Sequence, residues 1–166
     1  MPYAINQGIR IHYEIDGDGP PLVLLHGLGG SLKSWRDLGY AEALKKDYLL
    51  ILIDARGHGA SDKPHDVESY GAKLRAADVV AVMDDINASR AHYFGYSMGG
   101  RIGFALARYA PDRFHSLILG GSSPYLGEAE DKALEVIRRR LEAGPEATIA
   151  YRERSLGRPL TPEEKT

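Results

Sequence analysis

The pentapeptide Gly95-Tyr96-Ser97-Met98-Gly99 decides how this chain folds, because it has the pattern G-x-S-x-G. It stands between a segment expected to be a strand (91–96) and one expected to be a helix (98–109), which is the context that this pattern requires. A serine on such a sharp turn projects its hydroxyl above the sheet, and the glycines let the backbone cross closely. The alternative is a serine that merely caps a glycine-loosened helix. We predict that Ser97 is a nucleophile, with Gly95 and Gly99 as structural positions.

The hydrophobic pattern around this motif predicts an α/β fold. Continuous apolar runs such as Leu22–Leu25 and Leu49–Ile53 are typical of strands buried on both faces. Segments with helical character alternate with these runs, which predicts a mostly parallel sheet with helices on both faces. Two N-terminal strands are expected at 3–6 and 9–15, a further strand at 117–119, and helices at 31–45, with Ser31 as N-cap, 68–87 and 98–109.

A glycine-rich segment, His26-Gly27-Leu28-Gly29-Gly30, directly follows the first apolar run. It matches neither phosphate-binding glycine pattern, G-x-x-x-x-G-K-[ST] or G-x-G-x-x-G. We predict instead an oxyanion loop, in which the N–H groups of Leu28 and Met98 hold a developing negative charge. The alternative is a plain strand-to-helix turn.

The segment Asp54–Asp62 follows the second run and is dense in short polar residues and glycine. Such a composition is typical of a tight loop that bonds to itself. We therefore interpret Asp54 and Arg56 as structural, and we do not expect His58 to be catalytic.

Together, the three motifs resemble those of the α/β-hydrolase family, in the branch of esterases, lactonases, C–C hydrolases and haloperoxidases. The resemblance covers about residues 3–124, and the motifs H-G-x-x-G, D-x-R-G-x-G-x-S and G-x-S-x-G follow in the family's order. It implies a partial α/β-hydrolase core at 1–124, without the family's C-terminal strands, the opening of a helical cap at 125–166, and hydrolysis of an ester, lactone or similar acyl substrate.

The family's catalytic acid and histidine have no counterpart here. The segment 120–125, where some relatives carry the acid, holds no carboxylate, and the one histidine after Ser97 is His115, which opens a strand. His92 also begins its strand, whereas His26 and His58 end strands on the catalytic side. We expect a fragment, a cleaved chain or part of a longer product, with base and acid from a missing segment or another chain. The alternative function is a non-catalytic scaffold that binds a ligand or partner.

Composition limits the remaining classes of function. The 166 residues carry a formal net charge of −2 with dispersed lysine and arginine, so we expect no nucleic-acid partner. With no cysteine, no basic leader and no long apolar run, we expect a cytoplasmic protein without membrane contact, metal or cofactor. The consecutive apolar residues 117–119 would leave an uncovered sheet edge, where we expect self-association or a complementing chain.

Overall fold

A computed structural model of the chain describes residues 2–124, 128–162 and 165. It divides into two compact units, and the division falls between Pro124 and residue 125. The first unit holds the sheet and the motifs. The assignment of the second unit as the beginning of a cap stays a prediction.

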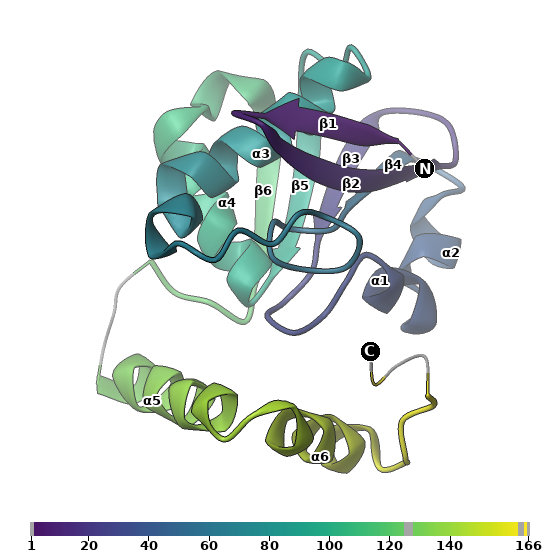
Figure 1. The fold of residues 1–166 in the computed structure, drawn as a ribbon. Coiled ribbons are helices and arrows are strands. Elements are labelled where there is room, and N and C mark those ends of the chain that lie inside the picture. Colours follow the sequence, from purple (N-terminus) through teal and green to yellow (C-terminus); the bar gives the residue numbers. More distant parts are fainter. Residues whose placement is uncertain (1, 125–127, 163–164, 166) are drawn as a thin grey trace. The chain divides into compact units, whose positions relative to one another are not determined.

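The first unit is built on a six-stranded sheet in the order β1-β2-β4-β3-β5-β6 (Figure 1). β3 is parallel to β4 and to β5, and β5 is parallel to β6, whereas β2 runs antiparallel to both β1 and β4. The predicted α/β class with a mostly parallel sheet is thus confirmed. The strands are β1 (Tyr3–Asn6), β2 (Ile9–Asp16), β3 (Pro21–Leu25), β4 (Leu49–Ile53), β5 (Ala91–Tyr96) and β6 (Phe114–Gly120).

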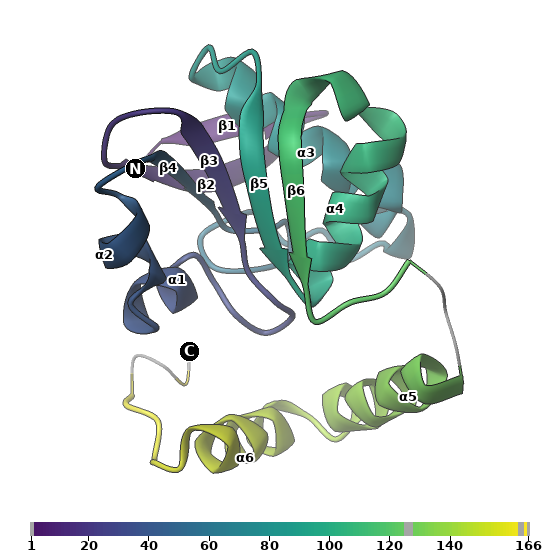
Figure 2. The ribbon, with the colours of Figure 1, turned by 180° about the vertical axis from the view of Figure 1, so that it is seen from behind.

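Helices cover both faces of this sheet, as predicted (Figure 2). Alternate residues of one strand enter separate cores, because successive side chains point to opposite faces. Val23 and Leu25 of β3 pack in the larger core, and Leu22 and Leu24 pack in the smaller one. This explains why β3 and β4 read as continuous apolar runs. The larger core is closed by α3 (Ala72–Asp85) and α4 (Met98–Tyr109), and the smaller by α1 (Lys33–Asp37) and α2 (Tyr40–Leu44).

The single helix predicted at 31–45 is wrong, because the segment forms the two short helices α1 and α2. Gly39 separates them with a φ of 79°, a left-handed conformation that glycine adopts without steric cost. Ser31 is not the N-cap of α1; that position is Leu32, and no side chain caps this helix end.

The helix predicted at 68–87 begins later than expected. The segment begins with a 3₁₀ turn (Val67–Tyr70). Gly71, with a ψ of 145°, separates this turn from α3. The sequence pattern predicts an apolar face on this helix, formed by Leu74, Ala77, Ala81, Met83 and Ile86. The residues that are fully buried are Ala76, Asp78, Val79, Val82 and Met83, so Met83 alone of the predicted face is fully buried. The hydrophobic pattern predicted the wrong face because a charged residue, Asp78, is buried on this helix in an ion pair with Arg56.

The second unit contains two helices, α5 (Glu128–Glu142) and α6 (Pro145–Leu156). They are separated by Gly144, whose φ is 91°. Glu135 pairs with Arg138 and Arg139 one turn along α5, and the guanidinium of Arg140 lies 3.4 Å from the centre of the Tyr151 ring on α6. The ion pairs of Glu135 lie within α5, and the contact of Arg140 with Tyr151 joins the two helices of this unit.

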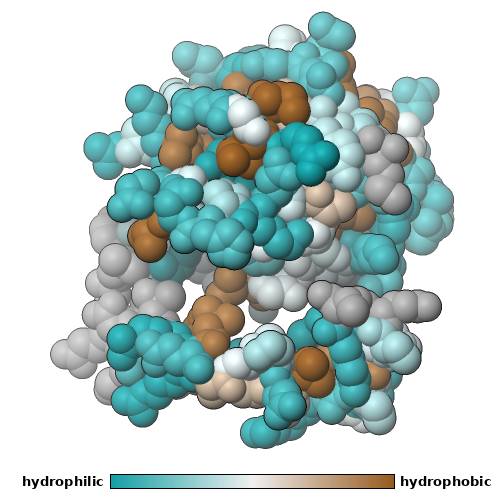
Figure 3. All heavy atoms as spheres, in the orientation of Figure 1, coloured by the Kyte–Doolittle hydropathy of each residue, from teal (hydrophilic) through white to brown (hydrophobic). Residues whose placement is uncertain are grey.

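The described surface is largely hydrophilic on the face drawn in Figure 3, where hydrophobic residues form small separate groups. Among residues 2–124, 128–162 and 165, no helix is long and apolar enough to cross a bilayer.

β6 forms one edge of the described sheet, because β5 is its single neighbour in the strand order. Leu117 and Leu119 pack against the larger core and are partly buried, whereas Ile118 on the opposite face is 55% exposed. The strand sequence Phe-His-Ser-Leu-Ile-Leu-Gly carries no lysine, acidic residue or proline, the residues that usually protect an edge from pairing.

We expect the 166-residue chain to self-associate through this edge unless another polypeptide covers it. Ile118→Lys places a charge on the open face of β6 and should shift the chain towards its 18.2 kDa monomer. Size-exclusion chromatography with light scattering measures this shift. Val67→Lys, at an apolar position away from the sheet that is 82% exposed, is the control. A wild-type chain that stays monomeric at high concentration with no second polypeptide would contradict the expectation.

Candidate active site

Ser97 occupies the sharp turn between β5 and α4, as the sequence predicts. β5 ends at Tyr96 and α4 begins at Met98, and Ser97 between them has a φ of 51° and a ψ of −106°. A side-chain-bearing residue in such a conformation costs about 1–3 kcal/mol, and the surrounding structure must impose it. The Ser97 N–H donates to the carbonyl oxygen of Gly120 at 2.8 Å, which fixes the turn to the end of β6.

The two glycines of the motif are required by the space around them. A methyl group on Gly95 would overlap the carbonyl of Gly99, and a methyl group on Gly99 would overlap the carbonyl of Leu25 at the end of β3. The buried hydroxyl of Tyr93 donates to the Gly99 carbonyl oxygen at 2.6 Å. The first turn of α4 is therefore held directly against the ends of β3 and β5.

The loop that follows β3 lies beside this turn, because β3 and β5 are neighbours in the sheet. A methyl group on Gly27 would stand 3.4 Å from Ser97 Cβ and 3.3 Å from the Tyr96 ring. The Gly30 N–H donates to the Gly27 carbonyl oxygen at 3.1 Å and closes the loop. The predicted oxyanion segment and the predicted nucleophile are thus brought together, while the Leu28 side chain is exposed.

Asp54, at the end of β4, organises the neighbouring loops. Its carboxylate accepts the N–H of Leu32 at 2.8 Å and the N–H of Ala60 at 2.9 Å, and His12 Nδ1 lies 2.8 Å from Asp54 Oδ2. Both side chains are almost completely buried. The bond to Leu32 ties the segment after the glycine-rich loop to β4.

Arg56 contacts Asp78 and Ser69. Its guanidinium forms a two-point ion pair with Asp78 of α3, with both N–O distances at 2.6 Å, and donates to the carbonyl oxygen of Ser69. The two charged side chains are buried, and Asn6 Nδ2 donates to the same carboxylate at 2.7 Å. Arg56 therefore joins β1, α3 and the loop after β4.

His26 is held as a neutral imidazole. Its Nε2 accepts the Ala55 N–H at 3.1 Å, and its Nδ1 lies 2.8 Å from the Gly27 carbonyl oxygen. Burial lowers the pKa of His26 to about 4. With both ring nitrogens occupied, His26 fastens the glycine-rich loop to β4 and has no nitrogen left to take a proton from Ser97.

His58 lies against His26, with ring centres 5.2 Å apart, and its Nδ1 lies 3.2 Å from the Arg56 carbonyl oxygen. Burial lowers the pKa of His58 as well. His92 and His115 lie at the starts of β5 and β6, the end of the sheet away from Ser97, as predicted. No hydrogen bond in the described structure joins a histidine to Ser97.

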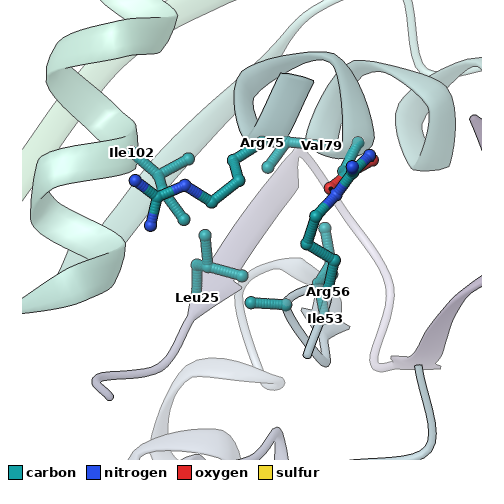
Figure 4. Close-up of a pocket in the computed structure, with 8 residues that line it drawn as sticks. Leu25, Ile53, Arg56, Arg75, Val79 and Ile102 are labelled. Atoms are coloured by element: carbon teal, nitrogen blue, oxygen red, sulfur yellow. Dashed lines mark hydrogen bonds and ion pairs between the residues drawn. The ribbon is translucent and has the colours of Figure 1, made fainter. Parts of the chain in front are cut away.

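Two cavities lie near the site. One has a volume of about 10 Å³, room for about one water molecule, and is lined by Arg56, Arg75, Asp78 and apolar residues between the sheet, α3 and α4 (Figure 4). The other, of about 340 Å³, opens beside the glycine-rich loop. Its lining residues are His26, Gly27, Ser34, Trp35, Leu38, Tyr40, Phe94 and Tyr96.

Two features of this region were not predicted from the sequence. The first is the buried pairing of His12 with Asp54, which joins positions 42 residues apart. The second is the aromatic wall of the larger cavity, where the Trp35 ring centre lies 4.8 Å from that of Phe94 and 5.5 Å from that of Tyr40. No local pattern signals either feature, because each depends on how the strands are ordered.

Comparisons with known proteins agree with this architecture. The family model described as the alpha/beta hydrolase fold matches residues 20–164, so the chain belongs to the α/β-hydrolase family. The 3-oxoadipate enol-lactonase 2 of Acinetobacter baylyi is 34% identical over 127 residues, which are 75% of this chain and 46% of that protein.

Solved structures show the same relation. A hydrolase from Pseudomonas aeruginosa has a TM-score of 0.72 and 32% identity, over 82% of this chain and 51% of that one. The enol-lactonase from Burkholderia xenovorans LB400 has a TM-score of 0.65 and 37% identity, over 71% of this chain and 45% of that one. The chain spans about half the length of the curated relatives it matches.

The neutral state of His26 predicts that acid destabilises the fold. In the unfolded chain the histidine takes up a proton near pH 6.5, whereas in the folded chain its pKa is about 4. The unfolded state binds more protons between these values, so stability falls as pH decreases, by about 2 kcal/mol from pH 7 to pH 4.5. His58 adds to the loss with the same sign.

Urea unfolding at pH 7 and pH 4.5 measures this loss. His26→Gln, which keeps an acceptor for the Ala55 N–H, should reduce the difference by about 2 kcal/mol relative to the wild type. His65→Gln, an exposed histidine in a loop, should leave the difference unchanged. An equal pH dependence in wild type and His26→Gln would show that His26 is not buried in its neutral form.

Proposed function

We propose that this chain carries the nucleophile and the oxyanion hole of a serine hydrolase that acts on a carboxylic ester, lactone or similar acyl substrate. The observation that carries the proposal is the geometry of Ser97: a strained residue at the end of β5, next to Gly27 and at the first turn of α4. A serine in this position exposes its hydroxyl above the sheet.

The roles follow from the chemistry of acyl transfer. Ser97 Oγ attacks the substrate carbonyl carbon, and the carbonyl oxygen takes up the negative charge. The N–H of Met98, at the free N-terminal end of α4, and the N–H of Leu28, in the adjacent loop, would donate to this oxygen. Removing one donor of such a pair typically costs about 10²–10³ in rate. This chemistry requires neither a metal ion nor an organic cofactor.

The proposed substrate class is supported by the relatives and by the larger cavity. Two of the matching proteins are named enol-lactonases, and a further matching structure is titled as an N-acyl homoserine lactone degrading enzyme. The cavity beside Gly27 offers about 340 Å³ with Trp35, Tyr40 and Phe94 on its wall. A small acyl compound with an apolar body suits these dimensions.

The base and the acid of the reaction are proposed to come from outside these 166 residues, either from a further segment or from another chain. His26 is fully bonded, His12 is paired with Asp54, and His92 and His115 lie at the far end of the sheet. A serine without a base is a weak nucleophile at neutral pH. The buried and bonded histidines also favour the second candidate function, a non-catalytic scaffold.

We predict slow but selective reaction of Ser97 with a fluorophosphonate at high concentration. The strained turn and the oxyanion donors remain in this chain, and they alone supply roughly 10³–10⁴ over water in enzymes of this chemistry. Peptide mass spectrometry should find the adduct on Ser97. The adduct should be absent in Ser97→Ala and present in the control Ser89→Ala, which alters an exposed serine. Modification of other serines with none on Ser97 would favour the scaffold.

We further predict that residues 1–166 hydrolyse p-nitrophenyl acetate far below ordinary enzyme rates. The missing base removes most of the catalysis and leaves the residual enhancement of roughly 10³–10⁴. Initial rates of the wild type and of Ser97→Ala measure this. Ordinary enzyme rates that Ser97→Ala abolishes would show that a base lies within this chain, and His58→Ala would then identify it.

A further inference from the structure

Two histidines meet at the end of the sheet opposite to Ser97. His92 lies near the start of β5 and His115 near the start of β6, the edge strand (Figure 2). Their ring centres are 5.3 Å apart and their planes are inclined by 40°. His115 is exposed and His92 is partly buried. The proposed hydrolytic function uses neither residue.

Ser116 orients one of these rings. Its Oγ lies 2.8 Å from His92 Nδ1, across the register that pairs the two residues on β5 and β6. When Nδ1–H donates to this hydroxyl, the lone pair of His92 resides on Nε2. A metal-binding histidine typically has its second ring nitrogen bonded in this way, which fixes its tautomer and its orientation. The Tyr48 ring stands edge-on to His92, with centres 6.1 Å apart, and restricts it further.

We propose that His92 and His115 form a binding site for a divalent late first-row metal ion such as Ni²⁺, Cu²⁺ or Zn²⁺. Imidazole nitrogens suit these ions and bind Zn²⁺ at about 2.0–2.1 Å. One ion between the rings would bridge β5 and β6, with water completing its coordination.

The number of protein ligands determines how firmly this site holds a metal ion. Structural zinc sites use four protein ligands and catalytic ones three. Within the described ranges, no group of three or more histidine, cysteine or acidic residues gathers. The ion at His92 and His115 is therefore exchangeable, and its effect is to clamp the edge strand. An ion that binds the folded chain alone raises the melting temperature.

Calorimetric titration of the tag-free chain with Ni²⁺ tests the proposal. We expect one Ni²⁺ per chain. His92→Gln and His115→Gln should each weaken binding by about tenfold or more, and Ser116→Ala by roughly tenfold through loss of the orienting bond. His65→Gln removes a solitary exposed histidine and should bind Ni²⁺ as the wild type does.

Thermal melting provides the second measurement. Ni²⁺ should raise the melting temperature of the wild type and of His65→Gln, and should leave that of the double variant His92→Gln/His115→Gln unchanged. Circular dichroism checks that each variant is folded. The proposal is overturned if the wild type binds no Ni²⁺, if the double variant binds it with wild-type affinity, or if only one of the two histidines matters.

Discussion

The close crossing of α4 over the ends of β3 and β5 is the constraint on which the site depends. Gly95 and Gly99 leave no room for a side chain between these elements, and the buried Tyr93 hydroxyl fixes the Gly99 carbonyl. This contact determines the path of the chain between strand and helix, and that path imposes the positive φ of 51° on Ser97. The strain on Ser97 is therefore balanced by the packing beneath it.

The motif after β4 supports the loop that faces Ser97. Asp54 binds the N–H of Leu32, and Ala55 donates its N–H to His26, so two bonds hold the segment after β3 against β4. The bond to the Asp54 carboxylate is worth about 1.5–3 kcal/mol and the bond to the neutral His26 ring about 0.5–1.5 kcal/mol, which together are enough to hold a short loop in one conformation. Asp54 takes part in one of these two bonds, and the interpretation of Asp54 and Arg56 as structural residues stays a prediction. An oxyanion hole needs such rigidity, because its donors must be in place before charge develops.

The sequence predicted the features that depend on local pattern. The continuous apolar runs predicted the strands, and the motif predicted the bounds of α4, because these signals need no knowledge of the tertiary contacts. The predictions from the sequence were wrong where the structure depends on a contact between residues far apart in the chain or on the backbone conformation of one residue. Gly39 divided one expected helix, and the pairing of Arg56 with Asp78 shifted the buried face of α3. The pairing of His12 with Asp54 depends on strand order, which the residues near either position do not reveal.

The central claim is that the N–H groups of Leu28 and Met98 converge on a charge formed at Ser97. A crystal structure of the chain after prolonged reaction with a fluorophosphonate tests it most directly. The account predicts a phosphonyl oxygen on Ser97 at about 2.7–3.1 Å from both backbone nitrogens. A phosphonyl oxygen directed to solvent, or a Leu28 nitrogen more than about 8 Å from Ser97, would contradict the account, since one oxygen cannot then bind both donors.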